Sequence, residues 1–558
     1  MKNIVKITVV LILLVATAFS GTLTFGYIVQ PSERSSLAVL VENDKNLLNP
    51  YGVIPVNTEK HPQANFDLAV AFVKFLISEE GQNLITDVKK DGESLFFPFA
   101  HNFTLAEALG FPNQKQEVEW YNSQTAFNIF SQWEPLLLAT TTSTYESGLL
   151  DFLIPVFERK FNVRVYTISV GTGQAIEIAK RGDADVVLVH SRELEEAFVR
   201  EGYGVHRVGL MYNDFVIIGP GNDPAGIKKV VNATEAFREI AEAGAEGKAL
   251  FISRADKSGT HLLELKMWSQ LGIQPSTGHY AWYLEAGASM ATVLRMSSEK
   301  QAYTLVDRGT WLSKRKELST PVLEGFFNAI KLIVSFNPEV VSITFLSLGV
   351  SGVAVLLGAV LSIPLGALLG WRSFRGKKPI VNLVGILSRN IVNTFMGLPP
   401  ILVGLVVYLI FSASGPLGPL ELLYSPTVMI VAQLIMVIPI IAGITMSAVG
   451  SVDKAIREKA LSLGATEWQT MFIVLREARI GILTAMVAAF GAAISEVGGI
   501  MIVGGNIRWH TRVLTTAILY ETELGNFGLA IALGIVLLSL AFVVNLILTY
   551  LQLKGVKR

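Results

Sequence analysis

Hydroxyl-bearing residues are concentrated in one short stretch of the chain, residues 139–150. Five of them follow one another, Thr140, Thr141, Thr142, Ser143 and Thr144. An apolar segment at 136–139 precedes them and apolar residues at helical spacing follow at 149–157, which predicts a strand-to-helix turn. The first N–H groups of a helix have no partner within it, and that end is electropositive, so it attracts anions. Ordinary N-capping needs only one hydroxyl, and the run of five therefore favours an anion-binding turn.

A second turn of this kind follows a predicted strand at 163–170. The segment Gly171-Thr172-Gly173 opens the next predicted helix. Ile176 stands where a dinucleotide-binding loop has its third glycine, so an anion-facing helix start is the better interpretation.

The third turn, residues 253–260, also lies between a predicted strand and a predicted helix. It combines a fork-shaped guanidinium donor with hydroxyls and helix-terminal amides, contributed by Arg254, Ser258 and Thr260. The alternative is that Arg254 pairs with Asp256 and that Ser258 only caps the helix.

Hydrogen-bond donors outnumber acceptors across these three turns. The ligand implied is an anion that accepts hydrogen bonds and donates none, such as a fully deprotonated tetrahedral oxyanion. Catalysis and metal binding have no comparable support, and we expect neither. His261 and Glu264 share a helix face, but no third ligand or nucleophile accompanies them, and we interpret them as solvated helix residues.

Composition divides the chain into a soluble part and a membrane part. The chain has 558 residues, of which 51% are hydrophobic, and its formal net charge is zero. The mean hydropathy of +0.47 is too high for a wholly soluble protein, and the apolar residues are concentrated after residue 320. The absence of cysteine excludes disulfides, thiolate metal sites and a lipid-modified N-terminal cysteine. The chain itself must therefore supply the membrane attachment.

Residues 1–30 carry Lys2 and Lys6 ahead of an apolar run at 7–27. The run suits a membrane-spanning helix of about 20 residues, although small residues at 16–20 also fit a cleaved signal peptide. We favour an uncleaved anchor. In either case the residues that follow leave the cytoplasm.

Residues 136–189 alternate predicted strands and helices, which predicts parallel α/β architecture. A helix is expected at 66–77. The expected pieces are a first part at 31–100, a linker with at most one helix at 101–135, and the main part at 136–319.

Residues 320–558 form the predicted membrane part. An amphipathic helix is expected at the interface at 322–336. The predicted spans follow at 341–370, 391–412, 426–449, 482–504 and 527–552. The loop after the first span is basic, with Arg372, Arg375, Lys377 and Lys378. Basic loops stay in the cytoplasm, so we expect the α/β domain outside, six spans with the first helix, and both termini in the cytoplasm.

Glu496 lies inside one of the predicted spans. An ionisable group is costly there and usually faces a partner or a pathway. Two interpretations stay open: a pathway or gate residue, and a structural hydrogen bond.

Several long motifs of the soluble part occur together in one order, at 138–148, 170–174, 182–190, 211–215 and 253–261. They resemble the motifs of the tungstate-binding proteins of ABC importers. The resemblance implies a two-lobed periplasmic-binding-protein fold, type II-like, that closes over tungstate, with molybdate as a near-isosteric competitor. Motif by motif, it implies oxyanion contacts from Thr141, Thr142, Ser143, Gly171, Thr172, Arg254, Ser258 and Thr260. Ala255 stands where the family usually has glycine, which puts the selectivity in doubt.

The order of the segments differs from that family. Residues 303–310 resemble a family segment that should be followed by pieces that stand here at the beginning of the chain, at 37–42, 49–56, 67–78 and 91–98. We infer a circularly permuted binding domain, with the family's own termini joined through 101–135. The alternative is two unrelated half-domains.

The membrane part resembles the permeases of the same transporter class. Residues 458–468 are similar to the coupling loop that docks in a groove of the ATPase, which implies that role for Glu458, Ala460 and Gly464. We expect Ala460 and Gly464 on one helix face, at positions i and i+4. Lys459 replaces the first alanine of the family motif, and Arg476 stands where many permeases have proline.

Energy must come from another subunit, because the chain has no phosphate-binding loop of the Gly-x-x-x-x-Gly-Lys-Ser/Thr type. We therefore expect a fused binding protein and permease in the cytoplasmic membrane, working as a homodimer with two ATPase subunits and importing tungstate. We expect no cofactor on this chain, no enzyme activity and no nucleic acid partner. Molybdate, sulfate and phosphate stay open as substrates, with Asp256 as the acceptor that phosphate would need. A membrane receptor for an oxyanion is the alternative from another class.

Overall fold

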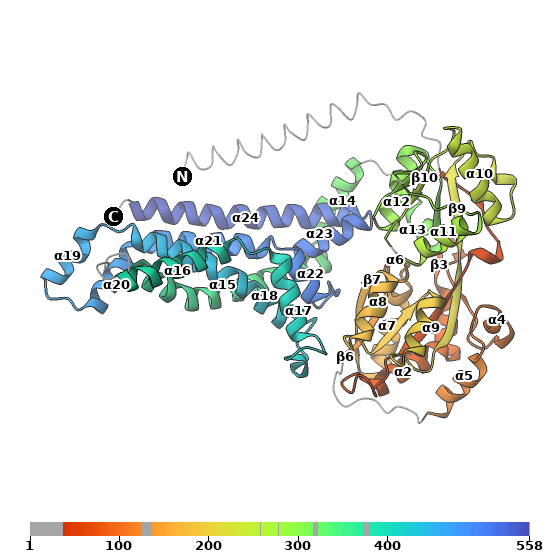
Figure 1. Ribbon diagram of the computed structural model, residues 1–558, viewed down its shortest axis with the longest axis horizontal. Coiled ribbons are helices and arrows are strands. Elements are labelled where there is room, and N and C mark those ends of the chain that lie inside the picture. Colours follow the sequence, from red (N-terminus) through yellow and green to blue (C-terminus); the bar gives the residue numbers. More distant parts are fainter. Residues whose placement is uncertain are drawn as a thin grey trace.

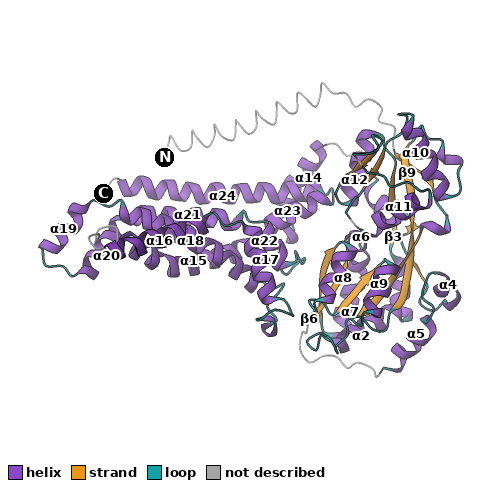
Figure 2. Ribbon diagram, viewed as in Figure 1, coloured by secondary structure: helices purple, strands orange, loops and turns teal. Residues whose placement is uncertain are grey.

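The computed structural model describes residues 37–124, 135–256, 258–276, 278–315, 322–371 and 379–556. The predicted helix at 1–30 and the basic loop at 372–378 lie outside these residues. Figure 1 shows an α/β part, which ends at Arg315, and an elongated helical part, which begins at Val322, placed end to end. Every strand described belongs to the α/β part (Figure 2).

The main sheet of the α/β part has eight strands. Six of them follow the order β1-β9-β2-β8-β6-β7, and β5 and β12 pair with β9. The strands are β1 (Leu37–Val41), β2 (Leu48–Pro55), β5 (Phe97–Pro98), β6 (Pro135–Thr141), β7 (Arg164–Val170), β8 (Val186–Val189), β9 (Val208–Pro220) and β12 (Thr304–Asp307). The first half of β9 pairs with β2, and its second half pairs with β1 and β12. β9 therefore runs through both lobes of this part (Figure 1).

The first lobe is built on β2, β8, β6 and β7. β6 is parallel to β7 and β8, whereas β2 is antiparallel to β8 and β9. Its helices are α2 (Phe66–Ile77), α3 (Glu79–Asp87), α6 (Thr142–Glu146), α7 (Leu149–Phe161), α8 (Thr172–Lys180) and α9 (Arg192–Arg200). The parallel prediction for 136–189 is correct for β7, β6 and β8. β2 and β9 lie outside that range and run antiparallel, because alternation along the chain does not show where an N-terminal segment enters the sheet.

Helix α2 confirms the prediction at 66–77. Asn65 caps it by accepting a hydrogen bond from the Leu68 N–H, and nine of its side chains are buried. β1 and β2, which flank α2 in the sequence, both pair with β9. Residues 37–98 and 135–315 therefore share one sheet and one core.

The second lobe contains β10 (Phe251–Ser253), β11 (Tyr283–Glu285), α10 (Ala233–Ala245), α11 (Gly259–Gln270), α12 (Met290–Lys300) and α13 (Arg308–Lys314). The interpretation of Glu264 as solvated is wrong. Its carboxylate is buried and accepts hydrogen bonds from the Ser253 hydroxyl, the Tyr283 hydroxyl and the Trp268 indole. His261 is buried as well. Tyr283 reaches Glu264 from a strand that follows α11 in the chain, so helical spacing could not reveal this contact.

The segment after residue 100 is more ordered than expected of a linker with at most one helix. It forms α4 (Phe103–Ala108) and α5 (Gln114–Ser123), after the short strands β3 (Lys89–Lys90) and β4 (Glu93–Ser94). The buried Gln114 side chain donates to the carbonyls of Ala100 and Gly209 at 3.0 and 2.8 Å. One side-chain amide therefore fixes α5 to β9. A hydrogen bond of this kind produces no periodic pattern of apolar residues, so the sequence did not predict it.

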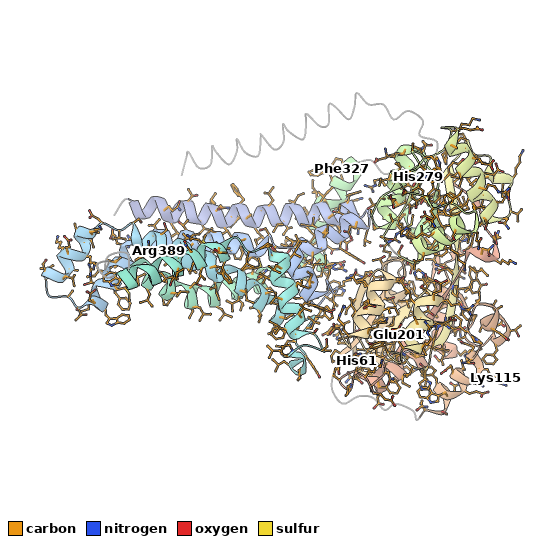
Figure 3. All side chains as sticks on the ribbon, in the orientation of Figure 1. His61, Lys115, Glu201, His279, Phe327 and Arg389 are labelled. Atoms are coloured by element: carbon orange, nitrogen blue, oxygen red, sulfur yellow. The ribbon has the colours of Figure 1, made fainter. Side chains whose placement is uncertain are left out.

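The described residues of the helical part include three helices that are long and apolar enough to cross a membrane, or up to five if each of two bent pairs is one span. Its helices are α14 (Val322–Val334), α15 (Pro338–Trp371), α16 (Pro379–Met396), α17 (Pro400–Phe411), α18 (Pro426–Gly450), α19 (Lys454–Ser462), α20 (Glu467–Glu477), α21 (Arg479–Ile494), α22 (Gly498–Gly504), α23 (Leu514–Glu523) and α24 (Phe527–Val556). In Figure 3, Phe327 marks α14 near the α/β part, and Arg389 marks α16 toward the other end.

Two predicted spans are bent rather than straight. The span expected at 391–412 breaks by 93° between α16 and α17, and the one expected at 482–504 breaks by 61° between α21 and α22. Pro399 and Pro400 explain the first break, because proline donates no N–H and disfavours helical backbone in the residue before it. The bent segments touch closely: a Cβ on Gly404 of α17 would lie 2.5 Å from the Cα of Gly499 of α22.

Candidate functional site

The first two hydroxyl-rich turns lie at one edge of the sheet. In the parallel register, Thr141 of β6 is opposite Val170 of β7, and Thr140 is opposite Leu188 of β8. The residues that follow these three strands are therefore neighbours in space. The crevice beyond the carboxyl ends of parallel strands is where open α/β sheets bind ligands.

The hydroxyl run forms the short helix α6 and the residues before it. Thr140 donates to the Leu188 carbonyl at 2.7 Å, and the hydroxyls of Thr141 and Thr144 are 2.6 Å apart. Thr141 also caps α6 by accepting from the Thr144 N–H. Ser143 Oγ lies 3.2 Å from His190 Nε2, at the end of β8. Part of the run thus supports the turn itself, and the predicted contacts Thr142 and Ser143 stand in the first turn of α6.

The second turn begins α8, with Gly171 as its N-cap residue. Thr172 is 1% exposed, and within the described part of the chain its Oγ1 has no hydrogen-bond partner. A buried hydroxyl without a partner is uncommon in folded proteins. Thr172 therefore offers a hydroxyl for a ligand.

The third turn contains both contacts of the alternative interpretation, the Arg254–Asp256 ion pair and the Ser258 helix cap. Arg254 Nη2 lies 2.6 Å from Asp256 Oδ2, and Ser258 caps α11 by accepting from the His261 N–H. Arg254 is nevertheless 5% exposed, and its Nε has no acceptor among the described residues. The guanidinium thus keeps donor capacity beyond its ion pair.

Arg254 faces the first lobe across the sheet edge. Its positive charge lowers the pKa values of Glu146, His190 and Asp307, although burial is the largest influence on each. Gly259 packs on the His190 ring, since a Cβ there would lie 2.5 Å from His190 Cε1. The predicted residues Ser258 and Thr260, on either side of Gly259, are both buried. The structure therefore brings the first and third turns together around His190.

Ala255 occupies a left-handed backbone conformation, with φ of 51°. This region is costly for residues with a Cβ and free of that cost for glycine. The departure at Ala255 therefore falls at a position whose backbone favours glycine.

Four residues near the turns were not predicted as site residues: Tyr51, Glu146, His190 and Asn213. The Tyr51 ring lies 4.9 Å from the His190 ring, and Asn213 Oδ1 accepts from Asn49 at 2.7 Å. All four lie within or beside the sequence motifs of the α/β part, which is the signal that could have identified them.

Burial shifts the pKa values of His190 and Glu146 in opposite directions. Burial, with Arg254 nearby, lowers the pKa of His190 to about 4, so its imidazole is neutral at pH 7. Burial raises the pKa of Glu146 to about 7, and its Oε2 has no hydrogen-bond partner among the described residues. A readily protonated Glu146 carboxyl reduces the negative charge near Arg254, which makes the site more favourable for an anion, whereas the neutral His190 imidazole adds no positive charge.

The predicted coupling residues lie at the far end of the helical part (Figure 1). Glu458 and Ala460 belong to α19, but Gly464 lies beyond its end with φ of 86°. Its N–H donates to the Leu461 carbonyl, and the Ala465 N–H donates to the Ala460 carbonyl. These bonds form a Schellman motif, so the expectation that Ala460 and Gly464 share a helix face is wrong: Gly464 ends the helix.

Glu496 lies at the break between α21 and α22. Its Oε1 accepts from the Gly499 N–H at 2.9 Å, and its carbonyl accepts from the Thr515 hydroxyl at 2.5 Å. The structural hydrogen bond considered for Glu496 is therefore present. The pathway role stays a prediction.

Two family models match the chain. Residues 112–336 match the PBP superfamily domain, and residues 362–554 match the binding-protein-dependent transport system inner membrane component. The prediction of a periplasmic-binding-protein fold joined to a helical permease is confirmed.

Relatives match the two parts separately. A tungstate-binding protein of Peptoclostridium acidaminophilum is 46% identical over 210 residues, 37% of this chain and 71% of that protein. The tungstate uptake system permease protein of the same organism is 42% identical over 231 residues, 41% of this chain and 98% of that protein. An ABC transporter anion-binding protein of Haloferax volcanii is 51% identical over 189 residues, 34% of this chain and 53% of that protein, so the chain spans about half of that relative's length.

These identities extend over more than two thirds of the two Peptoclostridium proteins, one for each part of the chain. The chain therefore belongs to the family of the tungstate ABC importers, with the binding protein and the permease in one polypeptide.

Proposed function

We propose that this protein takes up tungstate as the fused binding protein and permease of an ABC importer. The observation that carries the proposal is the meeting of hydroxyl-rich turns with a buried arginine at the end of a parallel sheet. The two Peptoclostridium relatives, one for each part, are named for tungstate. Thr141, Thr142, Ser143, Gly171, Thr172, Arg254, Ser258 and Thr260 are the proposed oxyanion contacts.

Donor chemistry favours a fully deprotonated anion over phosphate. Asp256, the acceptor considered for a phosphate proton, already accepts from Arg254 and from the Ser258 N–H. Its two oxygens are therefore engaged within the turn. Molybdate is the competitor expected to bind most like tungstate, because both are tetrahedral dianions.

Circular permutation of the binding domain belongs to this proposal. The N-terminal strands β1 and β2 pair with β9 in the same sheet as the later strands. The two relatives align over 189 and 210 residues, fewer than the α/β part contains. In a permuted domain both ends of the α/β part lie toward membrane segments. We further propose that this part is outside the cell and that both termini are in the cytoplasm.

A separate ATPase is proposed to dock on α19 and α20, as two copies on a homodimer of this chain. Four large apolar side chains are exposed there, Leu463 at 80%, Trp468 at 67%, Phe472 at 69% and Ile473 at 44%. Helices α19 and α20 lie at the end of the molecule opposite the α/β part (Figure 1). An exposed apolar cluster of this kind is typical of a protein interface.

Calorimetric titration of the purified full chain with tungstate, molybdate, sulfate and phosphate tests the substrate. We expect tungstate to bind most tightly and Arg254→Ala to weaken it by roughly 10- to 100-fold, because a charged hydrogen bond contributes about 1.5–3 kcal/mol. Arg238→Ala is the control, since Arg238 lies exposed on α10 and pairs with Glu235. Binding of none of the four anions by folded protein would reject the proposal.

Co-purification with the ATPase tests the partner. Trp468→Ala should reduce the amount of ATPase recovered with the chain, because it removes the aromatic side chain at the centre of the exposed cluster. Phe327→Ala, which changes a residue that is 63% exposed on α14, is the matched control. Equal recovery from Trp468→Ala and wild type would place the ATPase elsewhere.

A further inference from the structure

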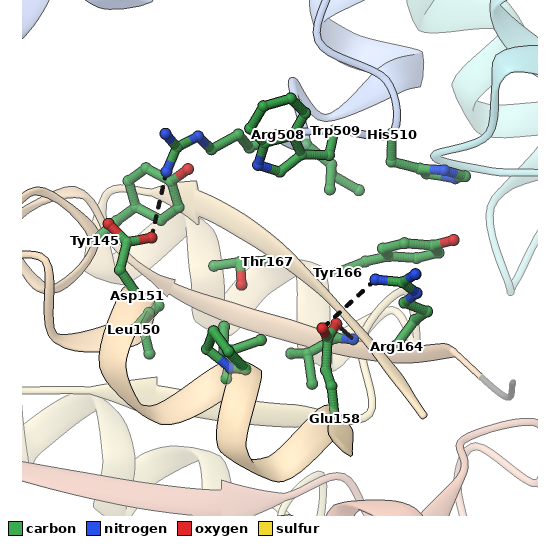
Figure 4. Close-up of a pocket in the computed structure, with 14 residues that line it drawn as sticks. Tyr145, Leu150, Asp151, Glu158, Arg164, Tyr166, Thr167, Arg508, Trp509 and His510 are labelled. Atoms are coloured by element: carbon green, nitrogen blue, oxygen red, sulfur yellow. Dashed lines mark hydrogen bonds and ion pairs between the residues drawn. The ribbon is translucent and has the colours of Figure 1, made fainter. Parts of the chain in front are cut away.

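Permease residues reach the edge of the proposed oxyanion site. The Tyr520 hydroxyl of α23 lies 3.4 Å from Ser169 Oγ, two residues before Gly171, and its ring lies 6.1 Å from the Tyr145 ring of α6. Figure 4 shows the preceding permease loop, with Arg508, facing Tyr145 and the helix that carries Asp151. One side of α23 and its loop thus lies beside two of the three turns.

Arg512, a basic residue of this loop, contacts α6. It is 4% exposed, its Nη2 lies 3.4 Å from the Tyr145 hydroxyl, and its guanidinium lies 4.8 Å from the Tyr520 ring centroid. Tyr145 is three residues after Thr142 on α6, about 4.5 Å along a helix. The guanidinium therefore contacts a side chain of the same short helix that carries the predicted oxyanion contacts Thr142 and Ser143.

The charges on this side form a connected group. Glu146 is influenced both by Arg254 of the third turn and by Glu521 of α23. Arg512 Nη1 lies 3.3 Å from Glu521 Oε1 and 3.6 Å from Glu339 Oε1. Glu146 is therefore within electrostatic range of Arg254 and of Glu521, the carboxylate that pairs with Arg512.

We propose that Arg512 is a permease-side binding residue for the oxyanion and receives it as it leaves the turns of the α/β part. The inference rests on the proposed function. Arg254 pairs with Asp256, and Arg512 pairs with two glutamates, so each arginine exchanges a carboxylate for the anion. Glu339 belongs to α15 and Glu521 to α23; a relative movement of these helices withdraws the carboxylates and uncovers the guanidinium.

Uptake measurements separate this role from a structural one. We expect Arg512→Gln to lower tungstate uptake at least 10-fold in cells that contain the chain and its ATPase, while tungstate affinity of the purified full chain changes less than threefold. Arg512→Lys should restore part of the uptake, because it keeps the positive charge. Arg508→Gln is the matched control: Arg508 binds Glu339 at 2.9 and 2.8 Å and Asp151 at 3.3 Å, and joins the two parts. Equal losses from Arg508→Gln and Arg512→Gln would overturn the proposal in favour of a docking role for both.

A binding measurement tests the site directly. In the full chain with Arg254→Ala, the added change Glu521→Gln removes a counter-charge from Arg512, and we expect a second, weaker tungstate-binding event to appear. A further Arg512→Gln change should abolish this event. An event that persists without Arg512, or no event in a folded double variant, would overturn the proposal. Absence of tungstate binding by the wild-type chain would instead reject the proposed function itself.

Discussion

Glu146 gives the most direct test of the electrostatics of the site. Folding raises its pKa from the ordinary 4.5 to about 7, chiefly through burial. The folded protein therefore holds this proton more tightly than the unfolded chain. Stability from this group is fully present below about pH 4.5 and is lost as the pH rises through about 7. Glu146→Gln keeps the neutral form at every pH and should remove the loss.

The magnitude follows from the two pKa values. A rise from 4.5 to about 7 corresponds to about 3 kcal/mol at about 1.36 kcal/mol per pH unit. We expect about 2 kcal/mol, because the residue as a whole is partly open to solvent. For a large domain this is a rise in Tm of roughly 4 °C at pH 8.5, with a much smaller rise at pH 5.

Differential scanning calorimetry of the full chain at pH 5 and pH 8.5 measures the effect. The control is Glu242→Gln, which changes an exposed glutamate on α10. The reasoning is refuted if Glu146→Gln shifts Tm equally at both pH values, or if the variant is less stable than wild type at pH 8.5.

Three other predictions concern single positions. Gly464→Ala should destabilise the end of α19 by about 1 kcal/mol, because a residue with a Cβ is strained at the φ of 86° that Gly464 adopts. Faster hydrogen exchange at residues 460–466 would confirm the effect. Gly450→Ala is the control, because a Cβ at position 450 would meet no atom within 4 Å. Gly404→Val should separate α17 from α22, since its Cβ would lie 2.5 Å from Gly499 Cα, and monodisperse protein from this variant on size-exclusion chromatography would contradict the expectation. Asp183→Asn should loosen the first lobe from the permease, because Asp183 accepts from the Tyr408 hydroxyl at 2.5 Å and the Ala413 N–H at 2.7 Å. Unchanged protease sensitivity of the full chain would argue against that contact.

Local signals in the sequence predicted the elements that depend on neighbouring residues. The apolar run after Asn65 predicted α2, the apolar spacing at 149–157 predicted α7, and the turns at 171–173 and 253–260 predicted the starts of α8 and α11. These features depend on helical spacing and capping, which a short stretch of chain contains in full. The short helix α6 inside the hydroxyl run was not predicted.

Contacts between distant segments could not be read in this way. Tyr51 and His190 meet in space although 139 residues separate them in the chain, and Tyr283 satisfies Glu264 from another element. The helix break at Pro399 and Pro400 is different, because the two prolines themselves indicate it. The prediction of one straight span at 391–412 relied on hydropathy, which does not register proline's effect on the backbone.

The single polypeptide changes the kinetics of delivery. Arg315, the last described residue of the α/β part, and Val322, the first of the helical part, are seven peptide steps apart, a reach of at most about 25 Å. A short tether turns encounter into an intramolecular event with an effective concentration on the order of millimolar. In the proposed importer, each permease domain therefore has its own binding domain, and the concentration of a free binding protein in the surrounding medium cannot limit the rate of import.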